Sequence, residues 1–290
     1  MWVIVINPIS GAGQGAIVGR QVVGFLSARD VPYEIITATT ALRLRKNLHA
    51  FIELNLDACD GVIGVGGDGL LHLILQEVVG VQLPYTIIPA GTGNDYARAL
   101  GWDMKEIESQ LTFVLNNSPE RIDLGLVDSE WFGAILSTGF DSIVNERANK
   151  LSWPRGAMKY NAAIAFELPK FKPVDYQIKL DGEVVETPAM LIAIANGSSY
   201  GGGMRVCPDA SMVDGLFDVM VLRPVSKFEF LKVFPRVFAG THIRHHAVDI
   251  YRASKVELQA EAIAYADGER VGGLPVTAEC LAGAGLSWTP

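Results

Sequence analysis

The chain has 290 residues, enough for two domains of ordinary size that each bury a core. Its net charge of −8 argues against broad nucleic-acid binding and a polybasic membrane anchor, and no apolar stretch is long enough to span a bilayer. The N-terminus has no signal-peptide pattern, and the three cysteines have neither metal-ligand nor redox spacing, so a reducing, cytoplasmic location is expected.

Between residues 2 and 120 the sequence predicts strands that alternate with helices. The predicted strands, which are short apolar runs, are 2–6, 33–37, 61–65 and 85–88. The predicted helices, which have apolar residues at helical spacing, are 14–28, 40–56 and 70–79. This alternation favours a parallel sheet. The second strand ends in Thr37 instead of the carboxylate of a dinucleotide site, which weakens a dehydrogenase interpretation.

Glycine-bearing loops follow three of these predicted strands. The loops are Asn7-Pro8-Ile9-Ser10-Gly11-Ala12-Gly13, Gly66-Gly67-Asp68-Gly69 and Pro89-Ala90-Gly91-Thr92-Gly93-Asn94-Asp95. Because open α/β sheets bind ligands at the carboxyl ends of their strands, the three loops are expected to converge. Glycine-rich turns and helix N-termini bind phosphate through N–H groups, and Asp68 would place a carboxylate beside it. The alternative is that each loop is only a tight turn and Asp68 an N-cap.

After about residue 115, short runs of β-forming residues dominate. The predicted strands are 121–127, 131–136, 175–180, 184–187, 190–195, 216–222 and 255–259. The turn Asp181-Gly182 predicts a hairpin, and helical segments are expected near 142–168 and 228–238. This pattern predicts an antiparallel sandwich or barrel. The predicted domains are therefore 1–120 and 121–290.

Motifs in a fixed order along nearly the whole chain resemble the diacylglycerol kinase and sphingosine kinase family. Besides the three loops, they are Gly139-Phe140-Asp141, Asn196-Gly197, Gly201-Gly202-Gly203, the segment from Asp209 to Asp218, and Asp267-Gly268-Glu269. The resemblance implies a Rossmann-like α/β domain that binds ATP and an antiparallel β-sandwich with inserted helices that holds the lipid. The implied activity is transfer of the γ-phosphate of ATP to a lipid alcohol such as diacylglycerol, at the inner membrane surface.

The resemblance also implies roles for individual residues. Those expected to line the ATP site are Asn7, Pro8, Ile9, Ser10, Gly11, Thr37, Gly66, Gly67, Asp68, Gly69, Leu70, Leu71, His72, Gly91, Thr92, Asn94 and Asp95. Asp267 or Glu269 is expected to be the general base on the lipid hydroxyl, and Asp68 to anchor a catalytic Mg²⁺ through water. A structural Mg²⁺ is expected on the Asp214 carboxylate and the carbonyls of Ser211 and Leu216, oxygen donors that suit this hard cation. In isolation, both C-terminal segments would be ordinary turns.

An apolar groove for acyl chains is also implied. Its candidate residues, most of which would be core residues, are Trp153, Met158, Tyr160, Ile164, Phe166, Leu168, Phe234 and Phe238. The three histidines His242, His245 and His246 are expected to be structural or surface residues, because the family has similar spacing without a metal.

Two features depart from the family pattern. Leu70 and Leu73 stand where the family usually has Thr and Glu, and no basic residue follows the Asn7-Pro8 loop. A kinase of a soluble substrate, of the NAD kinase type, is one alternative, since it shares the Gly-Gly-Asp-Gly turn. A non-catalytic ATP- or lipid-binding protein is another, which the missing Glu at position 73 would fit. The lipid acceptor, the identity of the base and the oligomeric state, a homodimer included, stay open.

Overall fold

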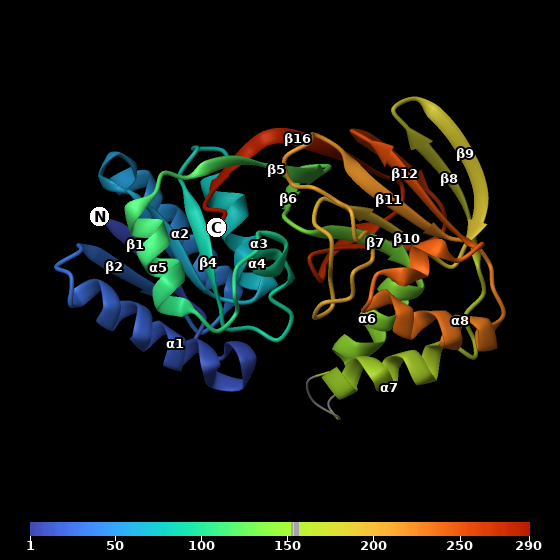
Figure 1. Cartoon of the computed structure of the whole chain (residues 1–290), viewed down its shortest axis with the longest axis horizontal. Coiled ribbons are helices and arrows are strands. Elements are labelled where there is room, and N and C mark those ends of the chain that lie inside the picture. The colour runs from blue at the N-terminus through green and yellow to red at the C-terminus, as the bar shows by residue number, and fades with distance from the viewer. Residues whose placement is uncertain (152, 154–156) are drawn as a thin grey trace. The chain divides into compact units, whose positions relative to one another are not determined.

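The computed structural model describes residues 1–151, 153 and 157–290, and it divides into two compact units (Figure 1). Unit 1 comprises residues 1–124 and 282–290, and unit 2 comprises residues 125–281. Unit 2 is thus inserted into the sequence of unit 1. Among the described residues, no helix is both long and apolar enough to cross a membrane.

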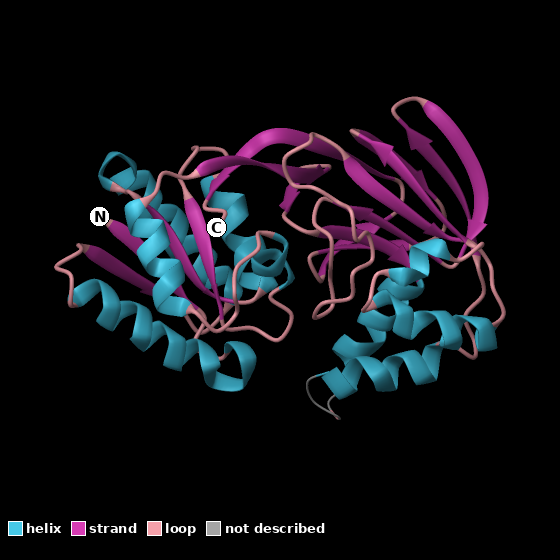
Figure 2. Cartoon of the chain, in the orientation of Figure 1, coloured by secondary structure: helices cyan, strands magenta, loops and turns pink. Residues whose placement is uncertain are grey.

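Unit 1 is built on a four-stranded parallel sheet in the order β2-β1-β3-β4. The strands are β1 (Trp2–Ile6), β2 (Tyr33–Thr37), β3 (Gly61–Gly66) and β4 (Tyr85–Pro89). The helices are α1 (Ser10–Ser27), α2 (Ala41–Asn55), η1 (Leu56–Ala58), α3 (Asp68–Val78), α4 (Asp95–Ala99) and α5 (Ile107–Asn116). Helix α1 packs beside α5, and α2 beside α3, on the two faces of the sheet (Figure 2). Because both faces are covered, β3 and β4 are buried along their whole length and are continuous apolar runs.

The last residues of the chain pack into unit 1. The Trp288 ring lies 5.5 Å from that of Trp2, centroid to centroid, and its Nε1–H donates to the Asn117 carbonyl at 2.8 Å. Ser287 Oγ donates to the Tyr85 carbonyl at 2.8 Å. Residues 282–290, which were predicted to belong to the C-terminal domain, therefore pack within unit 1.

Two six-stranded sheets dominate the second half of the chain. Their orders are β12-β11-β10-β7-β14-β15 and β6-β5-β16-β13-β8-β9. The strands are β5 (Glu120–Val127), β6 (Glu130–Phe132), β7 (Ile135–Gly139), β8 (Val174–Leu180), β9 (Glu183–Ala189), β10 (Leu191–Ala195), β11 (Phe217–Leu222), β12 (Val248–Ala253), β13 (Lys255–Gln259), β14 (Ile263–Ala266), β15 (Glu269–Gly273) and β16 (Val276–Ser287). Ladders such as β8–β9 and β10–β11 are antiparallel, as an antiparallel sandwich requires.

The alternation of side chains along β10 shows how the layers of unit 2 form. Ile192 and Ile194 point into the core between the sheets, whereas Ala193 and Ala195 point into a second core under the helices. The helices of this layer are α6 (Phe140–Lys150), α7 (Ala157–Glu167), α8 (Lys227–Val233), η2 (Phe234–Val237) and η3 (Thr241–Arg244). Small residues on the helix-facing side let the helices approach the sheet closely.

The structure confirms the predicted fold class of an N-terminal parallel α/β domain and a C-terminal antiparallel sandwich. Three predicted elements are divided in two. The helix expected at 142–168 becomes α6 and α7, and the one at 228–238 becomes α8 and η2. The strand expected at 131–136 becomes β6 and β7, because the chain bends at Gly133-Ala134 to donate backbone N–H groups to Asp267.

Candidate functional site

The loop after β1 turns through three successive residues with left-handed backbone conformation. Gly11, Ala12 and Gly13 have φ values of 55°, 58° and 98°, so regular helix geometry in α1 begins only after them. Asn7 accepts the Ser10 N–H at 3.2 Å through its carbonyl, which closes the turn. Ile9 is 78% exposed beside it. Successive N–H groups in such a turn form a concave surface of the kind that binds anions.

The three glycine loops of unit 1 contact one another. A Cβ atom on Gly11 would lie 2.3 Å from the Ala90 carbonyl oxygen, and one on Gly91 would lie 2.5 Å from the Gly67 Cα. Such distances are far below van der Waals contact, so only glycine allows this approach. The loops after β1, β3 and β4 thus form one continuous backbone surface at the carboxyl ends of three neighbouring strands.

Asp68 begins helix α3, whose N-cap is Gly67. Its Oδ1 accepts the Tyr96 N–H at 3.2 Å, so it links the loop after β3 to helix α4 and is not the N-cap of its own helix. Leu70 and Leu71 donate their N–H groups to the Gly67 carbonyl at 3.0 and 3.1 Å, and their side chains are buried. The side chain of His72 is also buried, at 6% exposure. Because Leu70, Leu71 and His72 are buried, Asp68 and Gly69 are the residues of α3 left to meet a ligand at its N-terminal end.

The loop after β4 is held by Asn94. Its Oδ1 accepts the Gly91 N–H at 2.8 Å, its Nδ2 donates to the Gly91 carbonyl at 3.0 Å, and its own φ is 54°. Asp95 opens α4, is buried, and lies 3.8 Å from the Arg98 guanidinium. Thr92 is exposed at the tip of the loop, and Thr37 is exposed at the end of the edge strand β2. The expected nucleotide-site residues of unit 1 thus fall into a connected loop cluster and a separate strand end.

Asp267, Gly268 and Glu269 form the hairpin that joins β14 to β15. Asp267 and Gly268 have φ values of 50° and 86°, as a type I′ turn requires. The Asp267 carboxylate accepts three backbone N–H groups, from Gly133 at 2.7 Å, Ala134 at 2.9 Å and Ile135 at 3.1 Å. Glu269 is exposed. The two acidic residues of the motif therefore have different surroundings.

Asp141 is a half-buried carboxyl group of the Gly139-Phe140-Asp141 motif that was not among the predicted site residues. It accepts the Ser137 hydroxyl at 2.5 Å and the Asn145 amide at 3.2 Å. Burial raises the pKa of Asp141, while hydrogen bonds from Ser137 and Tyr200 act in the opposite direction. Burial also raises the pKa of Tyr160, and the negative charges of Asp141 and Glu269 raise it further. Asp141, Tyr160 and Glu269 are thus electrostatic neighbours within unit 2.

The segment from Asp209 to Asp218 brings several carboxylates to one arginine. Asp214 pairs with Arg252 through Oδ2 and accepts the Leu216 N–H at 3.1 Å through Oδ1. Asp218 lies 3.3 Å from the Arg252 Nε. Burial raises the pKa of Asp218, and Asp214 and Asp209 raise it further, although Arg252 lowers it. The turn therefore carries more negative charge than Arg252 neutralises.

Of the three histidines, His242 lies apart from the pair formed by His245 and His246. His242 is buried, and its Nε2 lies 3.0 Å from the Val206 carbonyl. The Nε2 atoms of His245 and His246 lie 3.3 and 3.8 Å from Glu229 Oε1. In the described part of the chain, these three side chains are close enough together to hold a metal ion. However, His245 Nδ1 accepts the Ala247 N–H at 3.3 Å, which leaves the proton on Nε2 for Glu229. Both ring nitrogens are then used without a metal.

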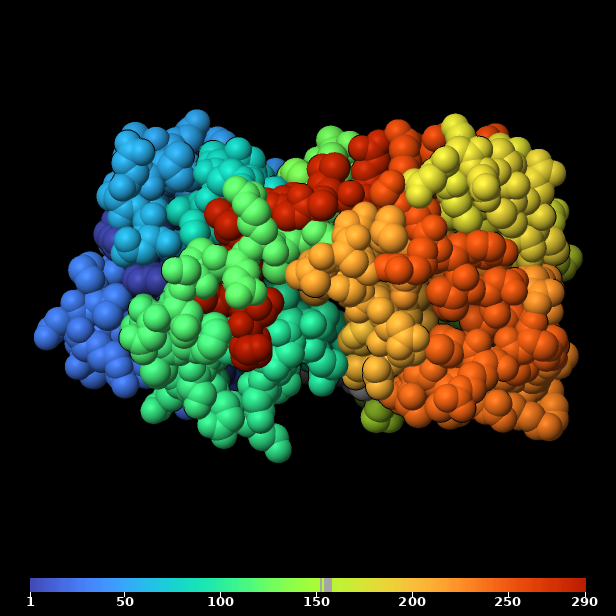
Figure 3. Space-filling view, turned by 45° about the horizontal axis from the view of Figure 1, so that its top comes forward, coloured from blue at the N-terminus to red at the C-terminus, as the bar shows by residue number. Residues whose placement is uncertain are grey.

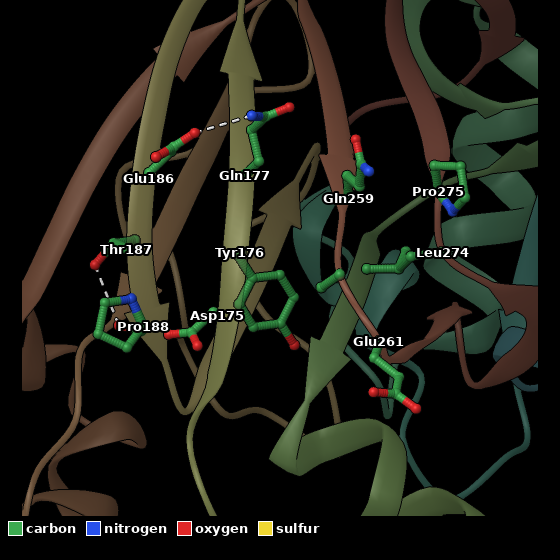
Figure 4. Close-up of a pocket in the computed structure, with 11 residues that line it drawn as sticks. Asp175, Tyr176, Gln177, Glu186, Thr187, Pro188, Gln259, Glu261, Leu274 and Pro275 are labelled. Carbon is green, nitrogen blue, oxygen red and sulfur yellow. Dashed lines mark hydrogen bonds between the residues drawn. The ribbon is translucent and has the colours of Figure 1, made fainter.

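A groove of about 810 Å³ lies along the end of strands β8, β9 and β13 of unit 2 (Figure 4). Its polar lining includes Asp175, Glu186 and Glu261, and Gln177 donates to Glu186 at 3.0 Å. None of the residues predicted for the active site lines it. The groove is therefore distinct from the candidate site.

Comparison with protein families identifies both halves of the chain. Residues 1–127 match the diacylglycerol kinase catalytic domain, and residues 134–285 match the YegS C-terminal NAD kinase beta sandwich-like domain. The chain is 37% identical over 276 residues to a diacylglycerol kinase of Mycobacterium tuberculosis (strain ATCC 25618 / H37Rv), which covers 93% of this chain and 88% of that protein. It is 31% identical over 232 residues to a diacylglycerol kinase of Bacillus subtilis (strain 168), which covers 78% and 77% of the two chains.

Solved structures share the fold. A crystal structure of a diacylglycerol kinase from Bacillus anthracis str. Sterne superimposes with a TM-score of 0.74 at 18% sequence identity. The superposition covers 100% of this chain and 96% of that one. A second structure from the same organism gives a TM-score of 0.79 at 20% identity, with 100% and 97% coverage. Both halves of the chain therefore have the architecture of these proteins.

Proposed function

This chain belongs to the diacylglycerol kinase family, and from that premise we propose that it is an ATP-dependent lipid kinase. It would transfer the γ-phosphate of ATP to the hydroxyl group of a lipid alcohol of the diacylglycerol type. The observation that carries the proposal is the contact between the three glycine loops, where Gly11 meets Ala90 and Gly67 meets Gly91. A side chain at Gly11 or Gly91 would push these loops apart, so glycine keeps the three backbones together and their N–H groups available to one phosphate chain.

We place the triphosphate of ATP on this surface. The turn at Gly11–Gly13 would offer backbone N–H groups, and the positive end of the α3 dipole at Asp68 and Gly69 would favour negative charge. The hydrogen bond from the Tyr96 N–H fixes the Asp68 carboxylate, which would orient the phosphates through a metal-bound water. Phosphoryl transfer depends mainly on such positioning and on neutralised charge, and a bound Mg²⁺ would supply that neutralisation.

Of the two acidic residues of the β14–β15 turn, we propose Glu269 as the general base. The Asp267 carboxylate is occupied by three backbone N–H groups that hold the turn, so its role is structural. Glu269 is exposed, and its negative charge contributes with that of Asp141 to raising the pKa of Tyr160. Glu269 would accept the proton of the lipid hydroxyl as the oxygen attacks the γ-phosphorus, and ADP would leave.

We propose that Ser211, Asp214 and Leu216 hold a structural Mg²⁺. The Ser211 and Leu216 carbonyls and the Asp214 carboxylate are hard oxygen donors, and the surplus of negative charge around Asp218 is what a divalent cation would relieve. When bound, the cation would cross-link the two ends of this turn and neutralise its carboxylates.

The experiment that tests the function uses labelled ATP with a panel of lipid alcohols in mixed detergent micelles, followed by product identification. We expect a phosphorylated lipid, and Glu269→Gln should lower its rate of formation about 10²–10⁴-fold with unchanged thermal stability. Asp267→Asn should instead lower stability by about 1–3 kcal/mol, because an amide N–H would face the backbone N–H groups. Full activity of Glu269→Gln would contradict its role as the base.

A second candidate, a kinase of a soluble substrate, has support from the match of residues 134–285 to an NAD kinase-like sandwich. The same labelled ATP with NAD in place of lipid separates the two. A third candidate, a protein that binds ATP or lipid without catalysis, has support from Leu73, which is buried in α3 where the family usually has Glu. ATP binding without product on either substrate would favour it.

A further inference from the structure

Helix α8 continues directly into η2, and this run carries an exposed apolar stripe. Phe228, Leu231, Pro235 and Phe238 follow one another at spacings of three, four and three residues, which places them along one side of a helix. Phe228 is 70% exposed, Leu231 55% and Phe238 54%. Figure 3 shows this part of the chain, in orange, at the surface.

The core of unit 2 does not need this stripe, because the opposite side of the run already supplies the packing. Phe230 and Val233 are buried, and the Phe230 ring contacts the Phe140 ring of α6 edge-on at 5.2 Å. Phe234 stacks on Phe230 at 5.7 Å. A surface helix normally has polar residues on its outer side. This run is apolar on both sides, which indicates that its outer side contacts an apolar partner.

The segment from residue 223 to residue 246, which contains this run, is basic in an acidic protein. Residues 223–246 contain five Lys and Arg and one acidic residue, Glu229, whereas the whole chain has 24 Lys and Arg against 32 Asp and Glu. Lys227, Lys232 and Arg236 are exposed and flank the stripe, and the Lys232 Nζ lies 4.4 Å from the centre of the Phe228 ring.

The surrounding charges leave this basic character in place. Glu229 faces His245 and His246 at 3.3 and 3.8 Å, and Asp249 pairs with Arg223 at 2.8 Å. Lys227 contacts the Pro169 carbonyl, which brings the exposed Lys170 and Lys172 close to the start of α8. More bases than acids therefore surround the apolar stripe.

We infer that the α8 surface, formed by Phe228, Leu231 and Phe238 with Lys227, Lys232 and Arg236, docks on a bilayer that contains anionic lipid. Exposed apolar side chains on such a helix enter the boundary between head groups and acyl chains of a bilayer, and flanking Lys and Arg bind the negative head groups. The combination of both on one helical run distinguishes this partner from a purely apolar protein groove. The inference rests on the proposed function, since docking would hold the enzyme on the surface where a lipid alcohol is found.

The test measures co-sedimentation with vesicles of phosphatidylcholine, alone or with phosphatidylglycerol, without ATP. The double variant Phe228→Ser/Leu231→Ser should bind mixed vesicles about tenfold or more weakly than the unaltered protein. The matched control is Leu42→Ser/Leu54→Ser on α2, whose side chains are 80% and 84% exposed, and it should bind normally. Unchanged binding by the α8 variant, with an unchanged melting temperature, would overturn the inference.

The contribution of charge is tested in the same assay. Lys232→Glu/Arg236→Glu should abolish the preference for phosphatidylglycerol and the sensitivity of binding to salt, since surface charge attraction is screened within about 8 Å at physiological ionic strength. Lys105→Glu, an exposed base of unit 1, is the control and should keep both. Equal binding of the protein to neutral and anionic vesicles would contradict the inference.

Two further measurements separate the possible failures. Activity on short-chain lipid in detergent micelles should be unchanged in the α8 variants, whereas activity on vesicle-embedded lipid should fall with binding. If vesicle binding responds to the variants but no lipid is phosphorylated, the docking surface stands and the proposed function fails. If light scattering shows that the stripe mediates a dimer, which Phe228→Ser/Leu231→Ser dissociates without any change in vesicle binding, the partner is a second copy and the inference is wrong.

Discussion

The close approach of Gly91 to Gly67 leaves no room for a side chain. In Gly91→Ala the added Cβ would meet the Gly67 Cα at 2.5 Å and Asn94 Oδ1 at 2.8 Å, so the two loops must separate. We expect a loss of stability of about 1–3 kcal/mol, as for other overpacked positions, and a larger loss of ATP affinity. Thermal unfolding and calorimetric ATP titration measure the two effects.

The control for this substitution is Gly24→Ala in α1. A Cβ there meets nothing within 4 Å, and its backbone is helical. Alanine in a helix is favoured over glycine by about 0.5–1 kcal/mol, so this variant should be at least as stable as the unaltered protein and bind ATP normally. Equal ATP affinity of Gly91→Ala and Gly24→Ala would show that the loop contact is not needed for nucleotide binding.

We expect the stability of the fold to depend on pH through His242. Burial lowers the pKa of His242 below its ordinary value, and the Val206 carbonyl offsets this only in part. The unfolded chain therefore binds the proton more readily, and stability should fall as the pH decreases from about 6.5 toward the lowered pKa. His242→Gln should flatten the dependence of melting temperature on pH between 7 and 5. His246→Gln, whose side chain is 76% exposed, should leave it unaltered.

At the scale of the elements, the turn at 209–218 predicts stabilisation by Mg²⁺. A cation that binds only the folded turn should raise stability by about 2.7 kcal/mol at a concentration of 100 times its Kd. Asp214→Asn should abolish the Mg²⁺-dependent rise in melting temperature. Asp57→Asn, an exposed acid of unit 1, should preserve it. A rise that persists in Asp214→Asn would rule out this turn as the binding site.

The elements that the sequence predicts well are those with a strong local pattern. Strand β3 and helix α3 have continuous apolar runs separated by a glycine turn, so their limits were found within one or two residues. Helix α5 was missed, because its buried residues Gln110, Leu111 and Val114 include a polar one that hydrogen-bonds the Ile87 carbonyl. The division of Asp267 and Glu269 into anchor and candidate base was equally hidden, since it depends on N–H groups more than 130 residues away.

At the scale of the whole molecule, Trp288 ties the end of the chain to its beginning. Its side chain is 3% exposed against Trp2, so Trp288→Ala should cost unit 1 about 3–5 kcal/mol. Trp153→Ala, at 78% exposure, should change stability by less than about 0.5 kcal/mol. Hydrogen exchange read separately for residues 1–124 and 125–281 measures the effect, and equal loss of protection in both units would contradict it.

The insertion of residues 125–281 between Leu124 and Ala282 fixes the order in which the protein can mature during synthesis. The first 124 residues leave the ribosome without the partner of Trp2, because that partner, Trp288, follows the inserted unit 2. Unit 1 therefore begins to emerge first but can complete its packing only after unit 2 has been synthesised. A nascent chain that reaches Leu281 but not Trp288 contains all of unit 2, whereas unit 1 still lacks the segment that packs against Trp2.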